Sequence, residues 1–268
     1  SIGIILNPSH LLHSELHGEG KVPFLLMHGL LGSSRNWRSV AKGLGDHFQM
    51  HCLDLRNHGD SFHEDDSSIQ AMSDDLLRYA NHQNIARFIL CGHSLGGKIA
   101  MRFACDHPSR VIKLIVADIA PRDYPREHHI PTLDALLGIN LNQLSSRKQA
   151  DEMLAELIPN WAFRQFLLTN LIQNENSFAW KANIPVLRDS IGKLSSNPLD
   201  AGDHFSGPSL FIRGGKSGYL RSEHKPEILK YFPVSEFVVL PNAGHDVHVE
   251  DRSGFLSALD KFLLIPPV

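Results

Sequence analysis

The chain has 268 residues, 42% of them hydrophobic and 21% charged, so it is long enough to bury the core of one large globular domain. A formal net charge of −3 offers no basic field for nucleic acid, and no run of 18 apolar residues offers a membrane span. Three cysteines argue against a disulfide framework, and the first 18 residues lack the features of a signal peptide, so we expect a cytoplasmic protein, monomeric or homodimeric.

Six short apolar segments predict buried strands. They are rich in Val, Ile, Leu and Phe and cover residues 22–28, 48–55, 87–92, 111–118, 209–213 and 236–240. Strands that are apolar on both faces belong to parallel sheets covered by helices. Segments with helical spacing lie between or after these strands, at residues 36–44, 72–83, 95–107, 222–232 and 251–264. The alternation predicts an α/β fold with a mostly parallel central sheet flanked by helices.

The alternation stops between Asp118 and Gly207. This segment has helical patterns but no convincing buried strand; the patterns cover residues 132–138, 147–158 and 163–172. Because a strand-like segment resumes at 209, we interpret the interruption as an insertion and not as a separate domain in tandem. The predicted division is a core of residues 1–118 and 208–268 with a helical cap, or lid, of residues 119–207.

A candidate nucleophile lies in "ILCGHSLGGKIAM". Gly92, Ser94 and Gly96 form G-x-S-x-G between a predicted strand and a predicted helix, which is the context that this motif requires. The serine needs a tight turn there, and the two glycines remove side chains that would collide. Residues 92–98 also fit a phosphate-binding G-x-x-x-x-G-K loop, but Ile99 stands where that loop needs Ser or Thr.

A candidate general base follows the last predicted strand. "VVLPNAGHDVHVED" contains His245, with His248 as its nearest rival. A metal site built from His245, His248 and Glu250 is an alternative, but the spacing is loose and no further ligand cluster is apparent. We expect His93, next to Ser94, to point away from the nucleophile and to pack structurally.

Together these segments resemble the α/β-hydrolase superfamily over nearly the whole chain. "HGLLGS", "DLRNHGDS", "GHSLGGK", "DIAPRDY" and "GGKSGY" are similar to a group of small bacterial esterases and acyl-CoA thioesterases related to mammalian mitochondrial abhydrolases. The resemblance implies an oxyanion hole formed by the backbone amides of Leu30 and Leu95. It also implies that the segment at 54–61 braces the site without taking part in the reaction.

The acid that should orient the histidine is missing from its usual place. In the superfamily this acid follows the strand before the last helix and strand, and Ser217 stands there. Asp118, at the end of the preceding strand, is the alternative, and the resemblance implies that this group uses it, with Ser217 hydrogen-bonded between Asp118 and His245. Asp118 as the cap of a helix at the lid entrance is the competing interpretation.

The predicted function is a serine hydrolase that cleaves carboxylic esters or acyl thioesters, including acyl-CoA, through an acyl-enzyme. The substrate is a small molecule, and the chemistry requires neither metal nor organic cofactor. Apolar cap residues are candidates for the acyl pocket, although such stripes also form the core of a lid: Leu136, Leu137, Trp161, Phe163, Phe166 and Leu167.

Two other functions stay open. The same triad supports a carbon–carbon bond hydrolase or lyase, whose sites usually gather arginines around a dicarboxylate, and Arg35, Arg122 and Arg126 are candidates. The absent carboxylate at Ser217 leaves room for a hydrolase-like ligand-binding protein with weak turnover, against which Ser94 and His245 argue.

Overall fold

A mostly parallel sheet of seven strands forms the centre of the molecule. The computed structural model describes residues 10–265, so the predicted absence of a signal peptide falls partly on residues 1–9, outside this range. The strand order is β1-β3-β2-β4-β5-β8-β9, and every neighbouring pair is parallel except β1 with β3. The strands are β1 (Ser14–His17), β2 (Val22–Met27), β3 (Phe48–Leu53), β4 (Phe88–His93), β5 (Val111–Ala117), β8 (Ser209–Gly214) and β9 (Ser235–Leu240). The predicted α/β class is confirmed.

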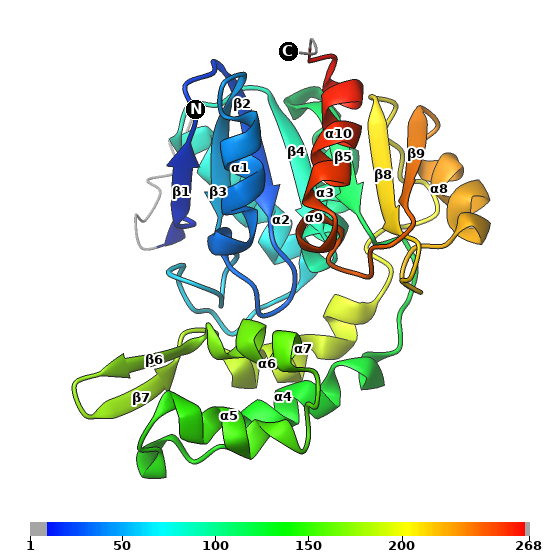
Figure 1. The fold of residues 1–268 in the computed structure, drawn as a ribbon. Coiled ribbons are helices and arrows are strands. Elements are labelled where there is room, and N and C mark those ends of the chain that lie inside the picture. Colours follow the sequence, from blue (N-terminus) through cyan, green and yellow to red (C-terminus); the bar gives the residue numbers. More distant parts are fainter. Residues whose placement is uncertain (1–9, 266–268) are drawn as a thin grey trace.

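Helices cover both faces of this sheet (Figure 1). Those outside the insertion are α1 (Arg38–Leu44), α2 (Ile69–His82), α3 (Leu95–Asp106), α8 (Lys225–Tyr231), α9 (Val247–Glu250) and α10 (Arg252–Leu263). The apolar side chains of α1 and α10 share one buried cluster, and those of α2, α3 and α8 share another. Successive residues of one strand point to opposite faces and enter different clusters, as Leu25 and Leu26 of β2 do. Both faces are therefore buried, which explains why the sequences of the central strands are apolar throughout.

The inserted segment, residues 119–207, contributes no strand to the main sheet. Its elements are α4 (Ile130–Leu137), α5 (Arg147–Ala155), α6 (Trp161–Leu168), β6 (Leu171–Asn174), β7 (Ser177–Trp180) and α7 (Ile184–Ser195). The segment lies against the edge of the sheet where the parallel strands end (Figure 1). Ligands of open α/β sheets bind at that edge, so a site is expected between the sheet and this segment.

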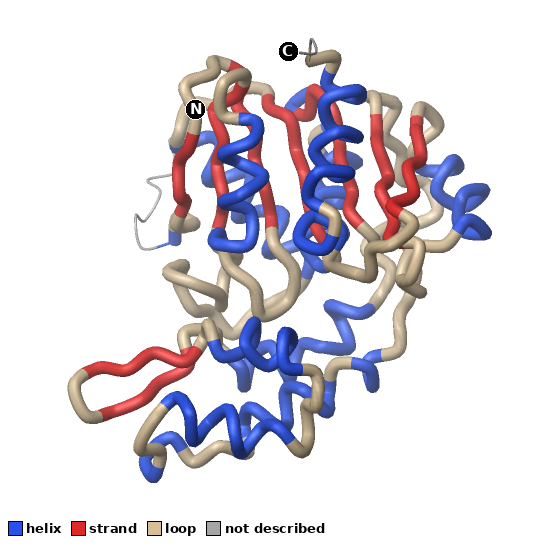
Figure 2. The backbone as a smooth tube through the Cα atoms, in the orientation of Figure 1, coloured by secondary structure: helices blue, strands red, loops and turns tan. Residues whose placement is uncertain are grey.

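Some elements differ from the predictions. The hairpin of β6 and β7, visible as the two projecting red strands in Figure 2, replaces the end of the helix predicted at 163–172. The turn of this hairpin carries Glu175 at φ 52°. Strand β1 pairs at the sheet edge and contains one apolar residue in four, so its sequence carries no strand signal. Strand β9 lies at the other edge and is half-buried, not enclosed on both faces as predicted.

None of the helices in residues 10–265 combines the length and the apolar character that crossing a bilayer requires.

Candidate active site

Ser94 lies on a strained turn between β4 and α3. Its backbone has φ 54° and ψ −116°, a conformation that few non-glycine residues adopt. A Cβ atom on Gly92 would lie 2.0 Å from the carbonyl oxygen of Gly96, and one on Gly96 would lie 2.3 Å from the carbonyl oxygen of Met27. The two glycines therefore allow β4, α3 and β2 to approach closely enough to hold Ser94 in this turn.

His245 contacts Ser94 with one ring nitrogen and a carboxylate with the other. Its Nε2 lies 3.0 Å from Ser94 Oγ, and its Nδ1 lies 2.8 Å from Asp118 Oδ2. Because an ionised carboxylate only accepts, Nδ1 carries a proton and Nε2 is left to accept from the serine hydroxyl. The structure thus brings together three side chains that the sequence separates by up to 151 positions.

Asp118 is fully buried and held from several directions. The backbone N–H of Gly214 donates to Oδ1 at 3.0 Å, and the Ser217 hydroxyl donates to Oδ2. Its own N–H donates to Ile212 at 2.7 Å, which continues the pairing of β5 with β8. Asp118 caps no helix, since the carboxylate bonds belong to the β8 loop and to His245. Ser217 therefore bonds to this carboxylate but, among residues 10–265, not to His245, so the expectation that it bridges the two side chains is met only on the Asp118 side.

Tyr219 is a site residue that the sequence analysis missed. Its ring stacks on that of His245, with centroids 3.9 Å apart and planes 22° from parallel. Its N–H donates to Ser217 Oγ at 3.1 Å. The signal was its place in "GGKSGY", two residues after Ser217 in a motif that had already been singled out.

The two other histidines near His245 are buried and support the loop that carries it. His93 Nε2 donates to the carbonyl oxygen of His245 at 2.9 Å, while burial lowers the pKa of His93 to about 4. His248 stacks on Trp37 at 4.2 Å and contacts neither nucleophile nor acid, so the rival base is a packing residue. His93 packs structurally as predicted, and its partner is the backbone of His245.

The geometry does not support the alternative that His245, His248 and Glu250 form a metal site. Among residues 10–265 one group of side chains is close enough to share an ion, and it contains His13, Asp54 and Asp60 instead of His245, His248 and Glu250. Both carboxylate oxygens of Asp54 already accept backbone N–H groups, from Ser34 at 2.6 Å and from Asp60 at 2.9 Å. 

Asp54 is also part of the expected brace beneath the site. Its carbonyl oxygen accepts from the Ser61 hydroxyl, and the neighbouring Arg56 pairs with buried Asp75 at 2.6 Å. Through these bonds the segment at 54–61 holds the loop at Ser34 and is itself anchored to Asp75 of α2.

The loop that carries Leu30 rests on two buried histidines. His28 Nε2 accepts from the N–H of Leu55 at 3.0 Å, and His58 Nε2 accepts from the N–H of Leu31 at 3.0 Å. Both rings are buried, and their bonds tie the ends of β2 and β3 together. Burial lowers the pKa of His28 to about 4 and that of His58 to about 3.

These buried histidines predict a loss of stability in acid. In the unfolded chain His28 and His58 bind protons below about pH 6.5, whereas in the folded chain the same two side chains stay neutral to much lower pH. Stability is therefore complete above about pH 6.5 and falls as the pH decreases, by up to about 1.4 kcal/mol per pH unit for each histidine. Urea unfolding followed by circular dichroism between about pH 8 and about pH 5 measures this slope.

The matched control is His82→Gln, since His82 is an exposed histidine at the end of α2. The control should show the slope of the parent chain. Equal free energies of unfolding at the two ends of the pH range would contradict the assignment of His28 and His58 as buried neutral groups.

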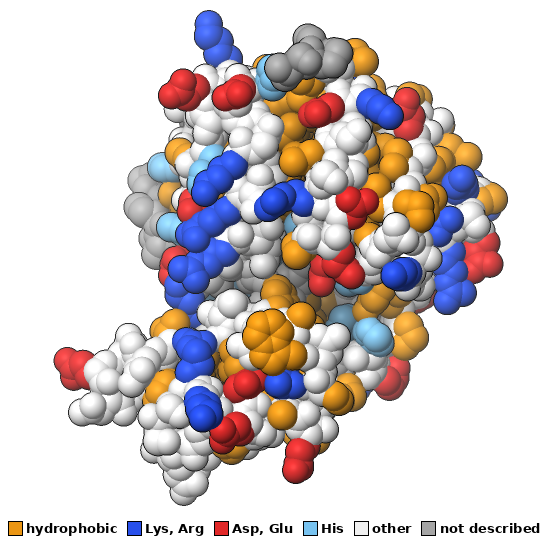
Figure 3. Space-filling model, viewed as in Figure 1, with side chains coloured by type: hydrophobic (Ala, Val, Ile, Leu, Met, Phe, Trp, Pro, Cys, Tyr) orange, Lys and Arg blue, Asp and Glu red, His pale blue; other side chains and the backbone are white. Residues whose placement is uncertain are grey.

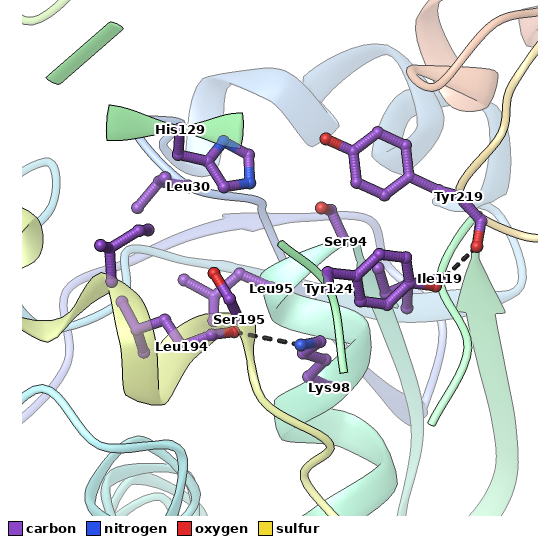
Figure 4. Close-up of a pocket in the computed structure, with 11 residues that line it drawn as sticks. Leu30, Ser94, Leu95, Lys98, Ile119, Tyr124, His129, Leu194, Ser195 and Tyr219 are labelled. Carbon is purple, nitrogen blue, oxygen red and sulfur yellow. Dashed lines mark hydrogen bonds between the residues drawn. The ribbon is translucent and has the colours of Figure 1, made fainter. Parts of the chain in front are cut away.

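A pocket opens directly beside Ser94 (Figure 4). Its space is about 370 Å³ when the open mouth is included, so the enclosed part is small. It is lined by Leu30, Ser94, Leu95, Lys98, Ile119, Tyr124, His129, Ile191, Leu194, Ser195 and Tyr219. Both residues whose amides were predicted to form the oxyanion hole, Leu30 and Leu95, are among them. His129 is half-buried there.

The aromatic residues of α6 lie elsewhere. Trp161, Phe163 and Phe166, predicted to contact substrate, do not line this pocket, and Trp161 is 67% exposed and Phe163 40% exposed. Figure 3 shows apolar side chains gathered on the outer surface over α6. Helix α7, which the sequence analysis did not predict, supplies the wall of the pocket instead through Ile191, Leu194 and Ser195.

The arginines proposed for a dicarboxylate site are also outside the pocket lining. Arg122 bonds to the ring of His224, while Arg35 and Arg126 do not line the pocket either. The arrangement beside Ser94 is therefore a serine, a histidine and an aspartate in one hydrogen-bonded line beside a small pocket of mixed polarity.

Comparison with known proteins agrees with this geometry. Residues 22–252 match the family profile described as the alpha/beta hydrolase fold. The chain is 36% identical to the mouse (Mus musculus) protein named sn-1-specific diacylglycerol lipase ABHD11, over 96% of this chain and 86% of that protein. It is 32% identical to Esterase YbfF of Escherichia coli (strain K12), over 90% of this chain and 92% of that protein.

A solved structure described as a marine microorganism esterase has the same architecture. It superposes with a TM-score of 0.92 at 36% identity, covering 94% of this chain and 99% of that one. The agreement extends through the inserted segment, because the matched share of the chain exceeds what the core alone provides.

Proposed function

The chain belongs to the alpha/beta hydrolase family and is a carboxylic ester hydrolase, and we propose that it cleaves esters and thioesters of short to medium acyl chains through an acyl-enzyme on Ser94. The observation that carries this proposal is the continuous hydrogen-bonded line from Ser94 through His245 to Asp118 beside the pocket. Acyl transfer to a serine requires a nucleophile, a base and an orienting acid in this order.

The proposed reaction has two half-reactions on the same side chains. His245 Nε2 takes the proton of Ser94 as Oγ attacks the acyl carbonyl, and Asp118 stabilises the resulting imidazolium. The amides of Leu30 and Leu95 donate to the tetrahedral oxyanion. His245 then protonates the departing alcohol or thiol. Water attacks the acyl-enzyme with His245 again as base, and the carboxylic acid leaves.

The acyl group is proposed to lie between the core and the inserted segment, which would make residues 119–207 a cap over the site. Ile119, Ile191 and Leu194 supply apolar contacts for an acyl chain on the pocket wall. The pocket that these residues line is small, which favours acyl chains of a few carbons over long fatty chains.

A chain-length panel tests the proposal. We expect kcat/KM for nitrophenyl esters to be highest for butyrate to octanoate and to fall by about tenfold or more at palmitate, because each methylene without space costs about 1–3 kcal/mol. The corresponding acyl-CoA thioesters should follow the same order, since the acyl pocket is shared. A maximum at palmitate would contradict the proposed pocket, and absence of thioester turnover would remove thioesters from the proposed substrates.

A further inference from the structure

One residue of the pocket is a buried lysine. Lys98 lies on α3, one turn after Ser94, and is 2% exposed. Its side chain lines the same pocket as Ser94, opposite Tyr219 and beside Ser195 and Leu194 (Figure 4). Burying an ammonium group is costly unless it is paired, so its partners decide what it does.

Lys98 lacks the carboxylate that the other buried cations have. Among residues 10–265, three further cationic side chains are buried, Arg56, Arg102 and Arg164, and each has a carboxylate within 2.8 Å. Within this range no carboxylate oxygen lies within 4.0 Å of Lys98 Nζ. Of these four buried cations in the described part of the chain, Lys98 is thus the one with no carboxylate in contact.

The groups that contact Lys98 Nζ are all neutral. Nζ donates to the carbonyl oxygens of Ser196 at 2.7 Å and Leu194 at 3.2 Å, and it lies 5.0 Å from the ring centre of Tyr124. Two carbonyls occupy two of the three N–H donors of an ammonium. Burial lowers the pKa of Lys98 to about 7, with Asp123 as the acid that opposes this change.

A second polar group in the pocket has no partner. The hydroxyl of Ser195 is buried, and Ser195 Oγ forms no hydrogen bond with any of residues 10–265. Ser195 ends α7 and lines the pocket together with Lys98. An unpartnered buried hydroxyl costs about 1–3 kcal/mol, so its presence beside an unpaired lysine indicates a ligand group that would satisfy both.

We propose that Lys98 and Ser195 bind a carboxylate at the far end of the acyl group, so that the preferred substrates are monoesters or monothioesters of short dicarboxylic acids. The inference rests on the proposed function, since it assumes that the acyl chain occupies the pocket beside Ser94. Ser94 attacks the ester carbonyl, while the free carboxylate of the same acyl group accepts from Lys98 Nζ and Ser195 Oγ. The reaction consumes water and releases the dicarboxylic acid and an alcohol or thiol.

A pair of isosteric substrates tests the charge directly. Monoethyl glutarate carries a free carboxylate at the position where ethyl glutaramate carries an uncharged amide. Monoethyl succinate and ethyl succinamate form a shorter pair of the same kind. We expect the wild-type kcat/KM, followed by proton NMR, to favour the carboxylate member of at least one pair by about 10- to 100-fold, as for a charged hydrogen bond. Equal rates within both pairs, or faster cleavage of the amides, would overturn the inference.

Variants then assign the preference to the two residues. Lys98→Met should reduce the ratio of the two kcat/KM values to about one, and Ser195→Ala should reduce it by about three- to tenfold. Lys113→Met is the matched control, because Lys113 also donates to a main-chain carbonyl, of Phe262, and lies over its ring, but it is remote from the pocket. The control should keep the wild-type ratio.

The readout separates a binding role from a structural one. If Lys98 merely held the end of α7 through its carbonyl bonds, Lys98→Met would slow both members of a pair equally and leave the ratio unchanged, which would refute the proposal. Should Lys98→Met fail to fold, Ser195→Ala and the wild-type ratios still decide, since Ser195 Oγ has no hydrogen bond to lose within residues 10–265.

Failure of the proposed function would look different. In that case wild-type enzyme would cleave neither member of a pair nor nitrophenyl butyrate. Turnover of butyrate without a preference for the carboxylate substrates would leave the proposed function in place and reject only the role of Lys98 and Ser195.

Discussion

Replacing Ser94 with alanine is expected to lower kcat for ester hydrolysis by about six orders of magnitude, as removal of the nucleophile does in the serine-protease template. Among residues 10–265 the Ser94 hydroxyl is the only hydrogen-bond partner of His245 Nε2. Alanine keeps the Cβ atom, so the turn at φ 54° loses no backbone freedom relative to serine. The effect should therefore appear in turnover and not in the thermal midpoint.

The measurement needs a chemical readout besides the rate. A fluorophosphonate should label the wild-type chain once, at Ser94, by mass spectrometry of the digested protein, and should not label the Ser94→Ala chain. Ser109→Ala, an exposed serine between α3 and β5, is the matched control and should label and turn over normally. Full hydrolysis by Ser94→Ala, or labelling at another residue, would remove Ser94 from the proposed role.

The central strands and the turn at Ser94 were predictable because their physical causes are local in sequence. A strand buried on both faces must be apolar throughout, and β4 is buried at every position. Gly92 and Gly96 are required by contacts under 2.5 Å, so the turn at Ser94 leaves a fixed spacing in the sequence. Such constraints act within a few residues and remain visible without the fold.

The pocket was less predictable because its lining depends on packing between distant segments. Helix α6 carries the apolar residues Trp161, Phe163 and Phe166, but their presence does not specify which side of the helix meets the core, and Trp161 and Phe163 lie at the surface. In the sequence, Lys98 is indistinguishable from an exposed lysine of a helix. Only the carbonyls at the end of α7, about a hundred residues later, reveal that it is buried.

The predictions for the two edge strands, β1 and β9, were wrong for a related reason. Strand β1 is stabilised by pairing with β3 and not by an apolar pattern of its own. Strand β9 has an apolar sequence, yet its place at the other edge leaves Val239 38% exposed. Position in the sheet, which the sequence of one strand does not encode, sets how much of it is buried.

Asp118→Asn is expected to reduce kcat by about 10⁴ while the chain stays folded, by analogy with the same change in the serine-protease template. Asparagine keeps an oxygen for the N–H of Gly214, so the loop that follows β8 retains its bond. Its amide nitrogen, however, donates where His245 Nδ1–H needs an acceptor, which favours the tautomer that protonates Nε2. Steady-state kinetics on nitrophenyl butyrate, with circular dichroism for folding, gives the comparison.

Ser217→Ala should cost about tenfold, since it removes one neutral donor from a carboxylate that keeps its other contacts. The control for both is Asp246→Asn, an acid next to His245 in sequence that lies 3.6 Å from His93 and is largely exposed. It should retain nearly full activity. Near-normal kcat for folded Asp118→Asn would instead place the orienting acid elsewhere, with Glu223 and Asp246 as the remaining candidates.

The double variant Asp118→Asn with Ser217→Asp addresses why a serine occupies the position of the usual acid. Ser217 and His245 both contact Oδ2 of Asp118, so a carboxylate at 217 would start beside the atom that it must replace. With Asp118 ionised, a second buried carboxylate there would be repelled, which explains why a neutral donor accompanies this aspartate. Once Asp118 is neutralised, that repulsion disappears, and the double variant should recover part of the lost kcat. If it recovers none while Asp118→Asn alone shows the full loss, the loop at Ser217 stabilises Asp118 but cannot itself orient His245.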